Sequence, residues 1–123
     1  MVQFHQVLRG TTVNVLFVCT LNRGRSVAAE RLYRRTPGMA VRSAGIDPRS
    51  VRQVSVSDVS WADQIIVFEA IHEQWIRDTF SGDLPSICNI GIPDEFTRDD
   101  PRLIAELREI LPGELGEPGS FRA

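Results

Sequence analysis

A cysteine and an arginine at the end of an apolar run have the types and spacing of a nucleophile beside an anion site. The run at residues 13–18 predicts a buried strand that ends at Cys19, and Arg25 follows where a helical pattern begins. The five residues between them are enough for backbone N–H groups to curl around a tetrahedral anion such as phosphate. Arg25 would add a bidentate clamp. We therefore expect phosphate capture followed by attack from Cys19.

The same surroundings favour the reactive form of Cys19. The thiolate is the nucleophilic form of cysteine, and inward N–H groups, a guanidinium and the first turn of a helix all stabilise negative charge. Asn22 and Gly24 suit a tight loop, because asparagine tolerates positive φ and glycine carries no side chain. The alternative is a structural cysteine in the core with Arg25 in a surface salt bridge, since free cysteine is among the most buried residues.

Three motifs, in the same order along the chain, resemble those of the low-molecular-weight protein tyrosine phosphatases. The family's loop pattern Cys-x-Gly-Asn-x-Cys-Arg-Ser is similar to Cys19-Thr20-Leu21-Asn22-Arg23-Gly24-Arg25-Ser26. The family's Ser-Ala-Gly after the second strand resembles Ser43-Ala44-Gly45, and its late Asp-Pro-Tyr loop resembles Ile92-Pro93-Asp94-Glu95-Phe96. The resemblance covers residues 13–112 and is greatest to a short bacterial branch of the family.

This resemblance implies a cysteine-dependent phosphomonoesterase, and within that class a protein tyrosine phosphatase that needs no cofactor. Cys19 would form a cysteinyl-phosphate, Arg25 would bind the phosphoryl oxygens, and Asp94 would protonate the leaving phenolate and then activate water. The implied phosphate-binding residues are Thr20, Leu21, Asn22, Arg23, Gly24, Arg25 and Ser26. The implied supports of the loop are Asn22, Ser26 and Ser43, with Ser26 also placed to cap the following helix.

Several positions depart from the family pattern and leave substrate specificity open. Leu21 replaces the loop glycine and Gly24 replaces the second loop cysteine, while Glu95 and Phe96 replace the proline and tyrosine after the acid. Leu21 and Arg23 would either project to the rim and tune substrate choice or be ordinary surface residues. Phe96 would form a wall of the cleft beside the acid.

The identity of the general acid also stays open between three aspartates. Asp94 fits the expected distance to the next helix, whereas Asp99 and Asp100 are well placed to cap that helix. Asp94 is therefore our expectation. His72 is expected to be an exposed helix residue, and Cys88 to be a core residue.

Two other functions compete with a phosphatase. A thiol-dependent arsenate reductase on the same fold would need further thiols, and Cys88 is the only other cysteine. A non-catalytic phosphate-binding module would need neither the nucleophile nor the acid.

Composition restricts the class of protein. The chain has 123 residues, a charge of −2 and 42% apolar residues, which indicate one domain without an overall attraction to nucleic acid or anionic membrane. We expect a cytoplasmic protein whose partner is a phosphotyrosine protein or a small aryl phosphate. No metal is expected, because the two histidines stand far apart. The oligomeric state stays open, with a monomer expected.

Strands and helices are expected to alternate along the whole core. Apolar runs predict strands at residues 13–18, 39–43, 64–69 and 86–90, with helices starting near residues 26, 57, 70 and 101. Such alternation predicts an α/β three-layer sandwich, a four-stranded parallel sheet with helices on both faces. Ligands then bind at the carboxyl ends of the strands, where Cys19, Ser43 and Asp94 would meet. The single domain would have its core at residues 13–112 and a flexible tail at residues 113–123.

Overall fold

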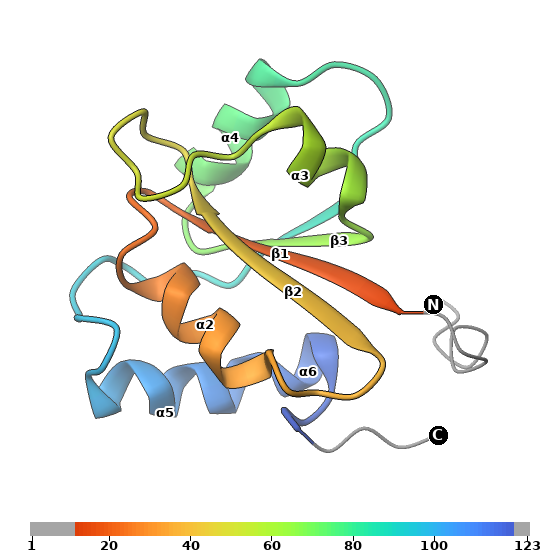
Figure 1. Cartoon of the computed structure of the whole chain (residues 1–123). Coiled ribbons are helices and arrows are strands. Elements are labelled where there is room, and N and C mark those ends of the chain that lie inside the picture. The colour runs from red at the N-terminus through yellow and green to blue at the C-terminus, as the bar shows by residue number, and fades with distance from the viewer. Residues whose placement is uncertain (1–11, 120–123) are drawn as a thin grey trace.

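A parallel sheet of four strands forms the centre of the computed structural model, which describes residues 12–119 (Figure 1). The strand order is β2-β1-β3-β4, so the second and third strands along the chain flank the first. The strands are β1 (Val13–Cys19), β2 (Met39–Gly45), β3 (Gln64–Val67) and β4 (Ser86–Asn89). The predicted four-stranded α/β fold is confirmed.

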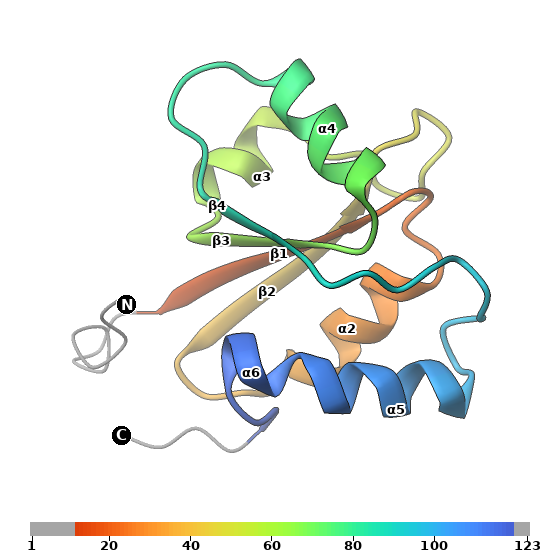
Figure 2. The same cartoon turned by 180° about the vertical axis from the view of Figure 1, so that it is seen from behind.

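Helices cover both faces of this sheet, as Figures 1 and 2 show from opposite sides. One face carries α2 (Arg25–Tyr33), α5 (Pro101–Ile110) and the short α6 (Pro112–Leu115). The other face carries α3 (Val56–Trp61) and α4 (Ala70–Thr79). None of these helices is both long and apolar enough to span a lipid bilayer.

Apart from Asn14, the central strand β1 is apolar because both of its faces are covered. Val15, Phe17 and Cys19 point into the cluster beneath α2 and α5, whereas Leu16 and Val18 point into the cluster beneath α3 and α4. This alternation explains a continuous apolar run in place of the polar–apolar repeat of a half-exposed strand. The layered core therefore fixes the face of the sheet on which the Cys19 side chain lies.

The C-terminal segment differs from the flexible tail that the composition suggested. Residues 112–115 form α6, in which Leu115 is buried, and the Tyr33 hydroxyl donates to the carbonyl of Gly116 over 2.7 Å. The Gly119 N–H donates to Thr36 Oγ1 over 2.7 Å. The prediction of a flexible tail is wrong for residues 113–119, because one apolar side chain and two hydrogen bonds hold them, and residues 120–123 lie outside the described residues.

Candidate active site

The loop after β1 turns sharply and packs its polar side chains beneath the nucleophile. Asn22 has a φ of 55°, as its type suggested, and its Nδ2 donates to Ser26 Oγ over 2.9 Å. Ser26 Oγ lies 2.9 Å from Cys19 Sγ. Because Ser26 accepts from Asn22, its own hydroxyl proton is available to Cys19. Ser26 is fully buried in this role and does not cap α2, whose N-cap is Gly24, so the expected capping role is wrong.

The carbonyl groups of the loop face the neighbouring segment. Those of Cys19 and Thr20 accept from the N–H groups of Ile46 and Asp47, and that of Leu21 accepts from Val51. The hydrogen bonds within residues 12–119 use these carbonyls but not the N–H groups of residues 20–24. Those N–H groups remain available for an anion beside Cys19, as in other anion-binding loops.

Gly45, the last residue of the Ser-Ala-Gly motif, lets the loop pack closely. A Cβ atom at this position would lie 2.6 Å from the carbonyl oxygen of Thr20 and 2.9 Å from the backbone nitrogen of Asn22. These are backbone atoms of the phosphate-binding loop and cannot rotate away.

We expect Gly45→Ala to displace the loop, lowering the free energy of unfolding by about 1–3 kcal/mol and weakening phosphate binding. Chemical unfolding and titration with inorganic phosphate measure the two effects. Gly113→Ala is the matched control, because a Cβ there meets no atom within 4 Å and its φ is not positive. Unchanged phosphate affinity in Gly45→Ala would show that the close packing does not shape the loop.

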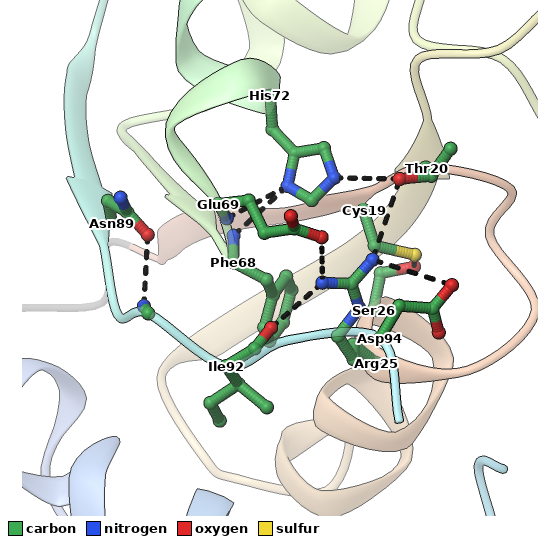
Figure 3. A network of polar contacts seen from close by, with 11 residues as sticks. Cys19, Thr20, Arg25, Ser26, Phe68, Glu69, His72, Asn89, Ile92 and Asp94 are labelled. Carbon is green, nitrogen blue, oxygen red and sulfur yellow. Dashed lines mark hydrogen bonds and ion pairs between the residues drawn. The ribbon is translucent and has the colours of Figure 1, made fainter. Parts of the chain in front are cut away.

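Arg25 is buried at the base of the cleft, with only 2% of its side chain exposed (Figure 3). Its Nη1 donates to Glu69 Oε2 over 2.5 Å and to the carbonyl of Ile92 over 2.8 Å. Its Nη2 lies 3.5 Å from Thr20 Oγ1 and 4.0 Å from Asp94 Oδ2. One nitrogen is thus held by the protein, while the other lies on the cleft side. This burial excludes a surface salt bridge for Arg25.

A cleft of about 600 Å³ opens above Cys19 and Arg25. The side chain of Asp94 is 67% exposed and lies on one wall with Phe96, which forms the expected wall beside the acid. Leu21 and Arg23 line the cleft as expected of rim residues. No three His, Cys, Asp or Glu side chains within residues 12–119 are grouped to hold a metal ion.

The three candidate aspartates have different partners. Asp100 is the N-cap of α5 and accepts from the Arg102 N–H over 2.9 Å. Asp99 also lines the cleft, but it accepts from Arg31 over 3.2 Å. Asp94 is the aspartate that faces Arg25 across the cleft.

His72 is buried, contrary to the expectation of an exposed helix residue. Its Nδ1 accepts from the N–H groups of Phe68 and Glu69 over 3.3 and 3.1 Å. The proton of the neutral ring therefore lies on Nε2, which donates to Thr20 Oγ1 over 3.0 Å. Burial, followed by the nearby charge of Arg25, lowers the pKa of His72 to about 4. A neutral histidine thus holds Thr20, the loop residue next to the nucleophile.

We expect this histidine to make folding depend on pH. Between its ordinary pKa of about 6.5 and its folded value of about 4, the unfolded chain binds more protons than the folded one. His72 therefore lowers the free energy of unfolding as the pH falls through this range. Urea unfolding of wild type and His72→Asn at several pH values should show a difference that shrinks toward pH 4, because asparagine keeps an acceptor for the backbone N–H groups without titrating. A difference independent of pH would contradict the assignment of a buried neutral ring.

Ser43 does not join Asn22 and Ser26, so its expected place in that network is wrong. Its hydroxyl donates to Glu30 Oε1 on α2 over 2.5 Å. Ser43 lies beside Phe17 in the sheet, two residues before the strand end at Gly45, and thus below the loop. This hydrogen bond connects β2 to α2, the helix that follows the loop.

Cys88 lies in β4, partly buried and packed against the core, where burial raises the pKa of its thiol. Cys88 pairs with Ile66, which pairs with Phe17 of β1. Two strand spacings of about 4.8 Å separate Cys88 from β1, which exceeds the Cα separation of about 7 Å that a disulfide can span. Cys19 therefore has no internal disulfide partner within reach.

We expect peroxide to oxidise Cys19 past the sulfenic acid, because Gly24 carries no thiol and the Cys88 thiol is too far away to trap that state. Thiol treatment should restore activity after brief exposure but not after prolonged exposure. Mass spectrometry of the Cys19 peptide should show two or three added oxygens. A Cys19–Cys88 disulfide with full recovery would overturn this expectation.

Two solved structures are similar to this chain. The YwlE arginine phosphatase from Geobacillus stearothermophilus aligns over 55% of this chain and 60% of its own, with 26% identity and a TM-score of 0.50. YfkJ from Bacillus subtilis aligns over 80% of this chain and 89% of its own, with 23% identity and a TM-score of 0.57. No protein-family model and no curated protein matches the chain. The structural matches confirm the fold that the resemblance implies: the chain has the α/β fold of the low-molecular-weight protein tyrosine phosphatase family.

Proposed function

We propose that this protein is a cysteine-dependent phosphomonoesterase that acts on aryl phosphates, with phosphotyrosine in proteins as the substrate class. The observation that carries the proposal is the meeting of three groups in one cleft. Cys19 lies at its base, the Nη2 of Arg25 is on the cleft side, and Asp94 lies 4.0 Å from that nitrogen. The N–H groups of residues 20–24 add the donors that a phosphoryl group requires.

The arrangement supports a reaction in two steps. The Cys19 thiolate attacks phosphorus, the bond from phosphorus to the leaving oxygen breaks, and Asp94 gives that oxygen its proton. Asp94 then takes a proton from water, whose oxygen attacks the cysteinyl-phosphate and releases phosphate and thiolate. Arg25 and the loop N–H groups hold the phosphoryl oxygens in both transition states. Ser26 donates to the departing thiolate in the second step.

Phosphoarginine is the second candidate substrate, because one of the two similar structures is named an arginine phosphatase. The cleft favours an aryl phosphate, since Phe96 and Leu21 give it apolar walls. Arg23 and Arg98, which also line the cleft, would repel the guanidinium group of phosphoarginine. Asp99 would favour phosphoarginine, but it is paired with Arg31.

We also place the protein in the reducing cytoplasm, because both of its cysteines are free.

Turnover of a small aryl phosphate and trapping of the phosphoenzyme test the proposal. Rapid acid quench during turnover should leave one phosphoryl group on the Cys19 peptide. Matched peptides that carry phosphotyrosine or phosphoarginine decide the substrate class by their kcat/KM values. Phosphate binding without turnover of any of these substrates would contradict the proposed enzymatic function and favour a non-catalytic phosphate-binding module. Arsenate consumption with an added thiol would favour the reductase.

A further inference from the structure

A second hollow of about 290 Å³ adjoins the proposed active-site cleft. It lies between α2 and α5, which run side by side on the same face of the sheet (Figures 1 and 2). The two hollows share Arg98 and Asp99 as lining residues, so they adjoin each other at these two residues. We call the second hollow the α2–α5 groove.

The α2–α5 groove has an apolar floor and a basic rim. Its floor is formed by Ala28, Leu32 and Ile104. Its rim carries three arginines, Arg31, Arg98 and Arg108, against a single carboxylate, that of Asp99.

These rim charges are only partly neutralised by the protein. Asp99 pairs with Arg31 over 3.2 Å, which balances those two residues. Among residues 12–119, no carboxylate lies within ion-pair distance of Arg98 or Arg108, and both side chains are exposed. The groove is therefore positive although the whole chain has a charge of −2.

We propose that the α2–α5 groove binds an acidic segment of the substrate protein, next in sequence to the phosphorylated residue that occupies the cleft. The proposal rests on the proposed function and specifies its substrate. Charge complementarity selects the acidic segment. Because the groove adjoins the cleft at Arg98 and Asp99, a peptide whose phosphorylated residue occupies the cleft can reach it. The apolar floor provides surface for the aliphatic parts of such a segment, which an isolated anion would leave uncovered.

The dimensions give the position of the acidic residues. From its first residue Pro101 to Arg108, α5 rises about 10 Å, which three to four residues of an extended peptide span. Arg98 lies at the boundary between the cleft and the groove. We therefore expect glutamates about three to six positions from the phosphorylated residue to have the greatest effect.

Two phosphotyrosine peptides test the proposal, one with glutamates at these positions and one with glutamines, beside a small aryl phosphate that cannot reach the groove. We expect kcat/KM of the acidic peptide to exceed that of the neutral peptide by about five- to twenty-fold at low salt. The difference should lie in KM with kcat unchanged, and it should diminish as salt screens the charges. If phosphoarginine is the residue hydrolysed, the same pair is made with phosphoarginine.

Arg108→Gln locates the effect, because Arg108 lines the groove and not the cleft. We expect it to reduce the preference for the acidic peptide about two- to five-fold and to leave hydrolysis of the aryl phosphate unchanged. Arg77→Gln on α4, across the sheet, is the matched control and should leave both unchanged. Equal kcat/KM values for the two peptides, or an undiminished preference in Arg108→Gln, would contradict the proposal that the groove binds an acidic segment. Continued turnover of the aryl phosphate would then still support the proposed phosphatase. Loss of turnover with every substrate would overturn both.

Discussion

Replacement of Cys19 by serine is expected to abolish hydrolysis of an aryl phosphate, lowering kcat at least about 10⁴-fold, as loss of a covalent nucleophile does in other enzymes. The serine hydroxyl is a weak nucleophile at neutral pH and, unlike the thiol, forms almost no anion. The change is also small in volume. Cys19 is buried with Sγ 2.9 Å from Ser26 Oγ, and a serine oxygen there can bond to the same partner. The expected loss is therefore one of chemistry rather than of fold.

Phosphate binding separates these two effects. Cys19→Ser should keep its affinity for inorganic phosphate, because Arg25 and the N–H groups of residues 20–24 remain. Phosphate should then raise its thermal stability as it does for wild type. Cys88→Ser is the matched control, since it removes the other thiol two strands away and should keep turnover. Turnover near the wild-type rate in Cys19→Ser would exclude a cysteinyl-phosphate.

The part of the site that lies in one short segment could be predicted from the sequence. Cys19, Asn22 and Arg25 are separated only by a loop, so strand, turn and helix signals along the chain were enough to place them together. Parallel strands also bring their carboxyl ends to one edge, which placed the Asp94 loop near Cys19. These relations depend on local sequence and on the fold class alone.

The contacts of Glu69 and His72 could not be predicted in this way. They follow β3, and the direct pairing of β3 with β1 brings that strand end next to the loop after β1. Ile71 is more apolar than its neighbour His72, yet the Ile71 side chain is 60% exposed while His72 is buried. Two backbone N–H groups and Thr20 supply every hydrogen bond that the buried imidazole needs, and their positions are not visible in the helical pattern.

Asp94→Asn is expected to lower kcat about 10²–10³-fold for a substrate with a poor leaving group such as tyrosine. The amide cannot give its proton to the leaving oxygen or take one from water. It has the size of the carboxylate, and the site is 67% exposed, so stability should not change. The loss should be smaller for a nitrophenyl phosphate, whose leaving group departs without a proton. Steady-state rates with both substrates measure this difference, which mere disturbance of the cleft would not produce.

The two neighbouring aspartates make this prediction specific. Asp100→Asn is the matched control, because asparagine also caps a helix and Asp100 binds the N–H of Arg102 away from the cleft lining. Asp99→Asn removes the other carboxylate of the cleft, which is held by Arg31 rather than turned toward Arg25. A loss that depends on the leaving group in Asp99→Asn, with Asp94→Asn near wild type, would transfer the acid role to Asp99. The 4.0 Å approach of Asp94 to Arg25 makes the opposite result the expected one, because the phosphoryl group bound by that guanidinium presents its leaving oxygen to the nearest acid.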